Sequence, residues 1–228
     1  MYLKICGVTD EQEIQQLSIL PVNLVGLWFG VPQGRSNLSA RRWHQLVMAT
    51  VASGAHLEPV LVTLLADARS IVEMLDSTGC RWVQLHGYQT PGMVGAIRAS
   101  VPDATIVKVL HLIGDGCPEA RFIRAYERAG VDFFLIDNAL SSGQVGSTGL
   151  PVSVVGLKAI IRTVTRPFLL AGGIRAGFRR KYGSLLADGR WQGIDVDTGA
   201  RTADGRLDSG TIIAMLHDLS DRRVGDVA

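Results

Sequence analysis

Short apolar runs and longer amphipathic stretches alternate along the chain. Each apolar run is rich in β-branched residues, ends at a break of Gly, Pro or Asp, and is followed by a stretch with helical spacing. The runs predict eight strands, at Tyr2–Cys6, Leu24–Phe29, Pro59–Leu64, Trp82–Leu85, Ile106–Leu110, Phe133–Ile136, Pro167–Leu170 and Gly193–Val196. The other stretches predict helices near residues 10–19, 39–52, 66–78, 90–100, 117–129, 152–164, 175–186 and 208–219.

The third amphipathic stretch carries the clearest helix signal. In DARSIVEMLDSTG, Ile71, Met74 and Leu75 recur at helical spacing, and Gly79 supplies a stop signal. Ser39 is a suitable N-cap for the second helix. The seventh stretch, RAGFRRKYGSLLADGRW, contains several glycines and no clean apolar face, so it predicts the weakest helix of the set.

The strand pattern indicates the fold class. Strands that are buried on both faces read as continuous apolar runs, as FFLI and PFLLAG do here. Eight strand–helix units with short connections predict an α/β protein, a single (β/α)8 TIM barrel that forms one domain over residues 1–228. An open doubly wound sheet is the structural alternative, but it has no need of eight units.

The composition mainly excludes classes of function and of site. With 47% hydrophobic residues the chain can bury a sizeable core, and a net charge of +2 gives no general attraction to nucleic acid or membrane. The three cysteines, Cys6, Cys80 and Cys117, are far apart and form no CxxC pair, so neither a disulfide framework nor a zinc site is indicated. No secretory leader or long apolar run is visible, which makes a reducing cytoplasm the expected location.

In barrels of this kind the reacting groups lie at the carboxyl ends of the strands. That rule selects a short set of candidates: Lys4, Cys6, Gln84, His86, Lys108, Asp137, Gly172, Gly173, Asp195, Asp197, Thr198 and Gly199. The two lysines are the most informative, because a lysine on the inner face of a barrel strand is costly unless it is paired or faces the open end.

Several candidates also have ordinary structural interpretations. Cys6 suits a small core hydrophobe, Asp137 a cap for the next segment, and His86 a loop histidine with satisfied hydrogen bonds. The glycine pair at 172–173 and the STG of 147–149 can present backbone N–H groups to a phosphate, although such pairs are common in loops. Their position after the sixth and seventh strands favours a phosphate site.

Taken in order, these motifs resemble the phosphoribosylanthranilate isomerase family of tryptophan biosynthesis. The resemblance rests on KICGVTD, VQLHG, FFLIDNA, GSTG, LLAGGI and IDVDTG, and it runs along nearly the whole chain. It implies an isomerase that rearranges an aminoaldose, N-(5-phosphoribosyl)anthranilate, to a 1-amino-1-deoxyketose (an Amadori rearrangement) without metal or organic cofactor. A small phosphosugar would be its only partner, with no nucleic acid or membrane, and the protein would be a monomer or homodimer.

The resemblance also implies roles for single residues. Cys6 is expected to be the general base that takes the C2 proton, and Asp137 the general acid that opens the furanose ring. The expected substrate-binding residues are Lys4, Arg35 (toward the anthranilate carboxylate), Gln84, His86, Lys108 and Asp195. The expected phosphate-binding residues are Gly146, Ser147, Thr148, Gly149, Gly172, Gly173, Thr198 and Gly199.

This chemistry sets pKa requirements and draws attention to departures from the family pattern. The pKa of the Cys6 thiol must fall, with Lys4 and Lys108 as the expected cause, whereas burial or bound phosphate must raise the pKa of Asp137. VPQGRSN and GSTGLPVSV differ from the usual family loops. DVDTGAR places Asp197 where a serine is usual and Arg201 where an acid is usual, and Asp197 would repel a phosphate that Arg201 and Arg175 could attract.

These departures leave two alternatives. The same acid–base pair could serve another aminosugar phosphate or a substrate of specialised metabolism, or the barrel could be a binding protein without catalysis.

Overall fold

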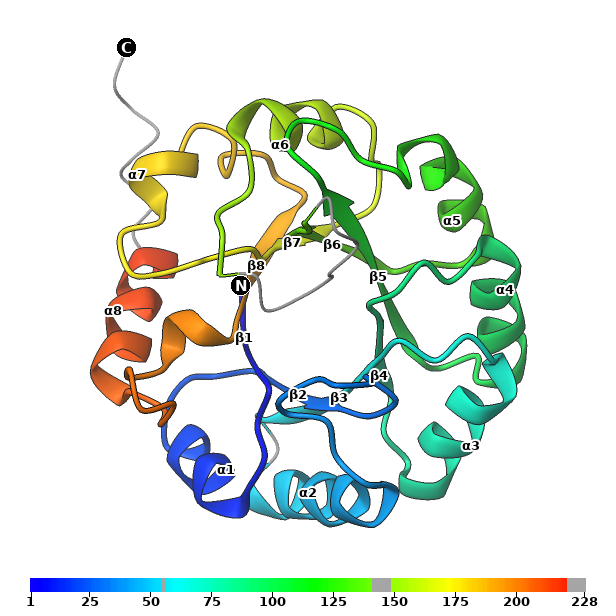
Figure 1. The fold of residues 1–228 in the computed structure, drawn as a ribbon, viewed down its shortest axis with the longest axis vertical. Coiled ribbons are helices and arrows are strands. Elements are labelled where there is room, and N and C mark those ends of the chain that lie inside the picture. The colour runs from blue at the N-terminus through cyan, green and yellow to red at the C-terminus, as the bar shows by residue number, and fades with distance from the viewer. Residues whose placement is uncertain (55, 141–148, 221–228) are drawn as a thin grey trace.

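Eight parallel strands close into a barrel in the part of the chain that the structure, a computed structural model, describes, namely residues 1–54, 56–140 and 149–220 (Figure 1). Strand order around the barrel follows chain order, and β8 pairs with β1. The strands are β1 Tyr2–Cys6, β2 Leu24–Trp28, β3 Glu58–Thr63, β4 Trp82–Leu85, β5 Thr105–Leu112, β6 Phe133–Asn138, β7 Phe168–Leu170 and β8 Trp191–Val196. The sequence-based prediction of a (β/α)8 barrel is confirmed.

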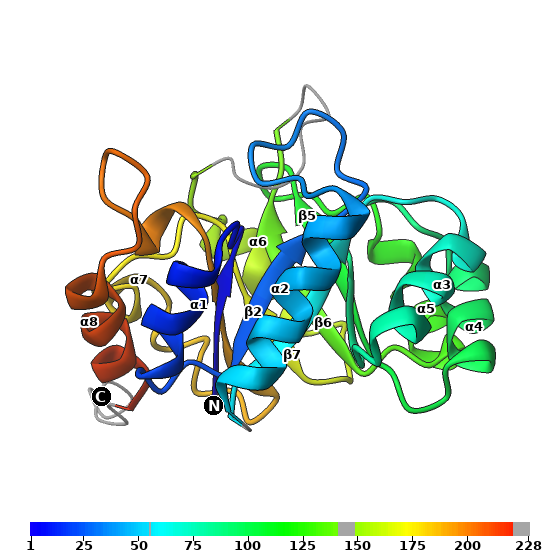
Figure 2. The ribbon, with the colours of Figure 1, turned by 90° about the horizontal axis from the view of Figure 1, so that it is seen from below.

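Helices surround the barrel as an outer ring, and Figure 2 shows them standing along its wall. They are α1 Glu11–Ser18, α2 Ala40–Ser53, α3 Ala68–Thr78, α4 Pro91–Ser100, α5 Ile123–Ala129, α6 Val154–Ile161, α7 Arg179–Tyr182 and α8 Ser209–Ser220, with 3₁₀ turns η1 at Ala120–Phe122 and η2 at Thr198–Ala200. None of the helices in the described ranges is long and apolar enough to cross a membrane.

Local signals explain where the helices start and stop. The Ser39 hydroxyl accepts a hydrogen bond from the backbone N–H of Arg42, and Gly79 ends α3 in the left-handed conformation, as the sequence predicts. The seventh helix is much shorter than the predicted 175–186. Gly177 has φ +82°, which interrupts the start of the segment, and only four residues become helical.

The direction of the side chains divides the core into two parts. Outward-facing strand residues pack against the helices in one large apolar cluster, which includes Ile5, Leu85 and Phe134. Inward-facing residues fill the barrel in two smaller clusters. Since side chains alternate along a strand, each strand supplies both layers.

Three aromatic rings close the amino-terminal end of the barrel. Tyr2, Trp82 and Phe133 stand at the first position of β1, β4 and β6, and their ring centroids lie 5.5 to 5.9 Å apart. Such edge-on and tilted contacts are the favourable geometries for aromatic pairs. The packed rings leave the opposite, carboxyl end of the barrel as the place where a cavity can form.

Candidate active site

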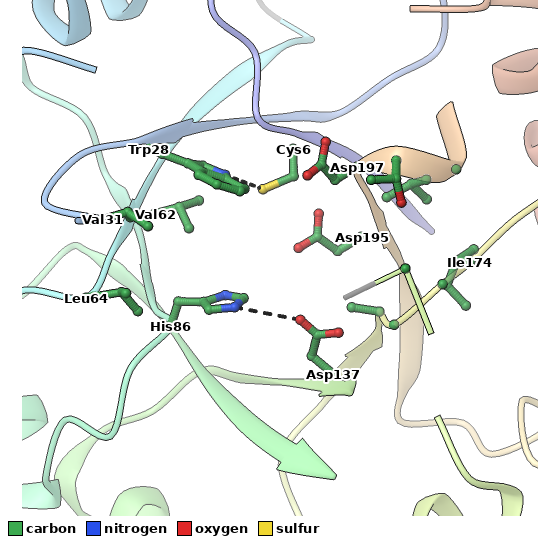
Figure 3. A pocket seen from close by; sticks show the side chains of 17 residues that line it. Cys6, Trp28, Val31, Val62, Leu64, His86, Asp137, Ile174, Asp195 and Asp197 are labelled. Atoms are coloured by element: carbon green, nitrogen blue, oxygen red, sulfur yellow. Dashed lines mark hydrogen bonds and ion pairs between the residues drawn. The ribbon is translucent and has the colours of Figure 1, made fainter. Parts of the chain in front are cut away.

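A cavity opens at the carboxyl ends of the strands and spans about 660 Å³, its mouth included. Figure 3 shows Cys6 and Asp137 on opposite sides of it, with Asp195 between them on the β8 side and His86 facing Asp137. Its lining residues are Cys6, Trp28, Val31, Val62, Leu64, His86, Asp137, Gly149, Ala171, Gly172, Gly173, Ile174, Asp195, Val196, Asp197, Thr198 and Gly199. The structure therefore brings most of the described candidates into one cavity.

The two ends of this cavity differ in chemistry. One end is apolar and is formed by Trp28, Val31, Val62 and Leu64 from the β2 and β3 side. The other end is made of backbone, because glycines from three loops line it. An aromatic ring suits the first end, and an anion that accepts backbone N–H hydrogen bonds suits the second.

Glycine is required where these loops meet. Gly173 has φ +59°, and a Cβ there would lie 2.7 Å from the carbonyl oxygen of Gly149. At Gly199 a Cβ would lie only 1.9 Å from the carbonyl oxygen of Ile174. The backbones approach too closely for any side chain, which explains the glycines in LLAGGI and VDTG. The predicted Gly146, Ser147 and Thr148 lie outside the described residues.

Two N–H donors hold the sulfur of Cys6. The Lys4 ammonium lies 3.2 Å from Sγ and the Trp28 indole N–H 3.1 Å from it. Gly26 makes room for this contact, since a Cβ there would lie 2.7 Å from Sγ and 2.9 Å from Lys4 Nζ. Both donors favour a thiolate over a thiol.

Burial of Cys6 opposes the effect of these two donors. Burial and the nearby Asp195 carboxylate raise the pKa of Cys6 to about 12, and the lowering by Lys4 and Trp28 does not compensate. The expectation of a lowered Cys6 pKa is therefore wrong in this structure, where the balance favours the thiol over the thiolate.

Lys4 forms a buried ion pair. Its Nζ lies 2.8 Å from Asp195 Oδ2, and both side chains are almost fully buried. Burial lowers the pKa of Lys4, but the Asp195 carboxylate and Cys6 outweigh it, so the pKa is raised and the amine stays charged. For Asp195, burial raises the pKa more than Lys4 lowers it.

Asp137 is the last but one residue of β6 and is 7% exposed. Its Oδ1 accepts a hydrogen bond from the backbone N–H of Asn138 at 2.7 Å, while Oδ2 lies 3.7 Å from Nε2 of His86. Burial and the charge of Asp195 raise the pKa of Asp137 to about 7. The carboxyl is thus half protonated near neutrality, in the direction that the sequence analysis requires of an acid.

Lys108 does not reach the cavity. It pairs in register with Leu85 and Phe134, which both face the helices, and its Nζ donates to the carbonyls of Gly87 and Val109 at 2.8 and 2.6 Å. The prediction that it lies on the inner face is wrong, because the strand's alternation turns it outward. Gln84 does face inward, in register with Val107, but it contacts His86 and is not among the residues that line the cavity.

Charged residues at the mouth form a network around Asp197. Arg35 is half-exposed at the rim, and its Nη2 lies 2.5 Å from Asp197 Oδ1. Nε of Arg201 lies 3.4 Å from the same oxygen, and Arg201 also pairs with Glu13. Two guanidinium groups therefore offset the carboxylate that stands in place of a serine, and the expected repulsion of phosphate is reduced.

Sequence analysis missed two features of the site. One is Trp28 as a donor to Cys6, and the other is a buried pair in which Nδ1 of His111 lies 2.5 Å from Oε1 of Glu119. His111 is on the inner side of β5, in register with Asp137. An inward histidine near a strand end is a signal that the strand-end rule could have included. Across the described ranges, no His, Cys, Asp and Glu side chains are grouped to hold a metal ion.

Comparison with known proteins gives a consistent match. A family model described as N-(5'phosphoribosyl)anthranilate (PRA) isomerase matches residues 3–218. N-(5'-phosphoribosyl)anthranilate isomerase 2 of Methanosarcina mazei is 28% identical over 218 residues, covering 95% of this chain and 93% of that protein. The isomerase of Methanothermobacter marburgensis is 30% identical over 228 residues, covering 95% and 93%.

The fold agrees with solved structures. The crystal structure of phosphoribosyl anthranilate isomerase from Thermus thermophilus superposes with a TM-score of 0.76 at 20% identity, covering 96% of this chain and 98% of that one. At this identity the likeness concerns the fold, while the family follows from the sequence matches. The chain belongs to the N-(5'-phosphoribosyl)anthranilate isomerase family.

Proposed function

We propose that this chain isomerises N-(5'-phosphoribosyl)anthranilate to the corresponding 1-deoxyribulose 5-phosphate by an Amadori rearrangement, with Asp137 as general acid and Cys6 as general base. The observation that carries the assignment of roles is the position of these two groups on opposite sides of one cavity (Figure 3). An acid for the ring oxygen and a base for C2 must approach one sugar from different directions, and this geometry suits that need.

The two ends of the cavity suit the two ends of the substrate. The phosphate fits the backbone N–H groups around Gly149, Gly172, Gly173 and Gly199, with Thr198 beside them. The anthranilate ring fits the apolar end beside Trp28. Its carboxylate would then be near the mouth, where Arg35 is the predicted partner. The ribose lies between these ends, over Cys6, Asp195 and Asp137.

In the first step Asp137 gives its proton to the furanose ring oxygen. The C1–O bond breaks, its electron pair stays on oxygen as the new C4 hydroxyl, and the nitrogen lone pair forms a C1=N double bond. The product is a cationic iminium. A carboxyl with a pKa of about 7 is protonated often enough near neutrality to act as this acid.

In the second step Cys6 removes the proton from C2. The C–H electron pair forms the C1=C2 bond of an enolamine, and the electrons of C1=N return to nitrogen. Transfer of the O2 proton to C1 then gives the ketone. The thiolate that this step needs forms when the Cys6 thiol gives its proton to solvent; the Lys4 and Trp28 donors stabilise it, and the positive iminium beside it lowers the pKa of Cys6 from its raised resting value. The proton that Cys6 takes from C2 then returns, through solvent, to the Asp137 carboxylate and restores the acid.

The decisive experiment follows the fluorescence of phosphoribosylanthranilate as purified protein consumes it. We expect turnover by the parent chain and a loss of about 10²–10⁴-fold or more in Cys6→Ser and in Asp137→Asn, with both variants folded. Turnover near the parent rate in either variant would show that its role is misassigned. A parent protein without turnover would refute the proposed reaction itself.

The remaining expectations concern partners and location. The reaction needs no second macromolecule, and we propose that the protein acts as a monomer or homodimer in a reducing cytoplasm. The proposed role of Cys6 requires a free thiol, which a reducing compartment preserves. Size-exclusion chromatography with light scattering measures the oligomeric state.

A further inference from the structure

Two buried imidazole nitrogens beside the general acid lack hydrogen-bond partners among the described residues. They are Nε2 of His86, the residue directly after β4, and Nε2 of His111 on the adjacent strand β5. The rings lie 5.7 Å apart in an edge-to-face arrangement. A buried polar nitrogen without a hydrogen-bond partner destabilises the fold, so its presence indicates a role in the chemistry of the site.

The neighbours of His86 determine which of its nitrogens carries the proton. Nε2 of Gln84 lies 2.9 Å from Nδ1 of His86, and the NH₂ group of an amide can only donate. The amide therefore donates to Nδ1, and the proton of the neutral imidazole is on Nε2. That N–H points toward Asp137, 3.7 Å from its Oδ2.

His86 stays neutral in this setting. Burial, together with the positive charges of His111, Lys4 and Lys108, holds the pKa of His86 well below its ordinary value. His111 is itself held by Glu119, which contacts both its Nδ1 and its backbone N–H. His86 is therefore a hydrogen-bond donor and has no proton to give as an acid near neutrality.

We propose that His86 is a positioning residue for the general acid, and that its Nε2–H hydrogen-bonds the carboxylate left on Asp137 after ring opening. Gln84 keeps the proton on Nε2, and the His111 ring, held by Glu119, packs against the His86 ring. The inference rests on the proposed role of Asp137. The distance of 3.7 Å is slightly too long for a hydrogen bond, and contacts of this kind tighten when substrate binds or charge develops.

The proton balance is simple. Asp137 loses one proton to the substrate and gains one hydrogen bond, while His86 keeps its proton throughout. The bond forms with the carboxylate and not with the protonated acid that starts the reaction, so it strengthens as the proton leaves and favours the transition state over the reactive ground state. The ionisable groups that face Asp137 from the surrounding elements are Lys4, Asp195 and Asp197, besides His86 and the His111–Glu119 pair.

A titration of the free protein tests the proposal without substrate. The ¹³C carboxyl signal of Asp137, assigned by its loss in Asp137→Asn, is followed against pH in the parent, His86→Leu and His86→Gln. We expect His86→Leu to raise the pKa of Asp137 by about one unit, because a donor to the charged form is lost. His86→Gln keeps an amide N–H in reach and is expected to stay near the parent value.

Kinetics provide the second measurement. We expect kcat of His86→Leu to fall about tenfold with KM nearly unchanged, and the alkaline limb of the pH–rate profile to move up with the carboxyl pKa. Gln84→Met, which no longer favours the Nε2–H form, should show the same changes at smaller size and remains informative if His86→Leu does not fold. His217→Leu, a change in the outer helix α8, is the matched control.

The outcomes separate the inference from the proposed function. An unmoved Asp137 titration in both His86→Leu and Gln84→Met overturns the inference even if the parent turns over. A rise in KM with an unmoved pH limb also overturns it and assigns His86 to substrate binding. A shifted titration in a protein without turnover supports the coupling and refutes the proposed reaction.

Discussion

Two lysines lie buried in the barrel wall and face opposite sides of it. Lys4 on β1 points into the barrel, and its ammonium contacts the Asp195 carboxylate and the Cys6 sulfur. Lys108 on β5 points toward the helices and contacts two carbonyls and the ring of Tyr126. The two side chains are almost equally buried, with Lys4 1% and Lys108 0% exposed. The pKa is nevertheless raised for Lys4 and lowered to about 8 for Lys108.

The difference teaches that burial alone does not assign a lysine to a site. Both lysines pay a desolvation cost, and only a carboxylate partner in direct contact reverses its effect on the pKa. Lys4 has such a partner and touches the expected base. Lys108 is near Glu119, but burial still lowers its pKa. Four predictions test this contrast.

The largest effect is expected for Lys4→Met. It removes the charged donor from the sulfur, and we expect kcat to fall about 10²–10³-fold. It also leaves Asp195 buried without its cation, which should cost about 3–5 kcal/mol of unfolding free energy. Steady-state kinetics and urea unfolding measure the two effects.

The double variant Lys4→Met/Asp195→Asn serves as the control, because it should recover much of the stability and none of the rate. Recovery of the rate would show that Lys4 acts only by holding the fold.

Gly26→Ala tests the contact between Lys4 and the sulfur without removing either group. The added methyl would meet Sγ at 2.7 Å and Nζ at 2.9 Å, so both must shift. A displacement of about 1 Å in a reacting group can cost about 10²-fold in rate. We expect such a loss with the protein still folded, while Gly95→Ala, where an added Cβ meets no atom within 4 Å, is the matched control. Equal rates for the two variants would contradict this account of the site.

Lys108→Met should change the pH dependence of stability. Between about pH 8 and 10.5 the unfolded chain holds a proton on Lys108 that the folded protein does not, so this residue's contribution to stability rises with pH in that window. Below pH 8 the cost of burying the charge is fully present. From pH 7 to 10.5 the unfolding free energy of the parent should therefore rise by about 3 kcal/mol relative to that of the variant.

The measurement is urea unfolding of both proteins with reductant at each pH. The difference between them is the relevant quantity, because buried groups such as Cys80, with its pKa raised to about 11, titrate in the same range. A difference that stays constant with pH would mean that Lys108 titrates normally in the folded state.

The smallest effect is expected on the turnover of Lys108→Met. Because the side chain lies outside the cavity, kcat and KM should stay within about threefold of the parent, as for variants away from reacting groups. A loss as large as that of Lys4→Met would restore the sequence-based prediction that Lys108 binds substrate.

The strand positions were predictable because strands buried on both faces are nearly pure apolar runs. The run predicted at Ile106–Leu110 continues to Leu112, since His111 pairs with Asp137 across β5 and β6. A polar residue at the end of an apolar run thus belongs to the strand when a residue of the adjacent strand pairs with it. Only the three-dimensional register shows whether it does.

The facing of Lys108 could not be read from TIVKVLHL, which is apolar on both sides of the lysine. Alternation does impose one constraint, namely that Lys108 and His111, three positions apart, must face opposite ways. Choosing between them needs the register with β6.

Cys6 and Asp137 were predictable as strand-end residues and through the family motifs. The raised pKa of Cys6 was not, because it depends on how deeply the sulfur is buried and on Asp195, nearly two hundred residues away. The Trp28 donor and the Glu119–His111 pair were missed for the same reason, since each depends on a contact between strands or on a loop that folds back.

The aromatic rings of Tyr2, Trp82 and Phe133 have one more consequence. Among the described residues these rings form the floor of the barrel, and the cavity opens at the opposite end, so the proposed substrate and product would both pass the rim, where Arg35 and Asp197 stand. Changes to the floor should alter resistance to heat, and changes to the rim should alter which molecules are admitted.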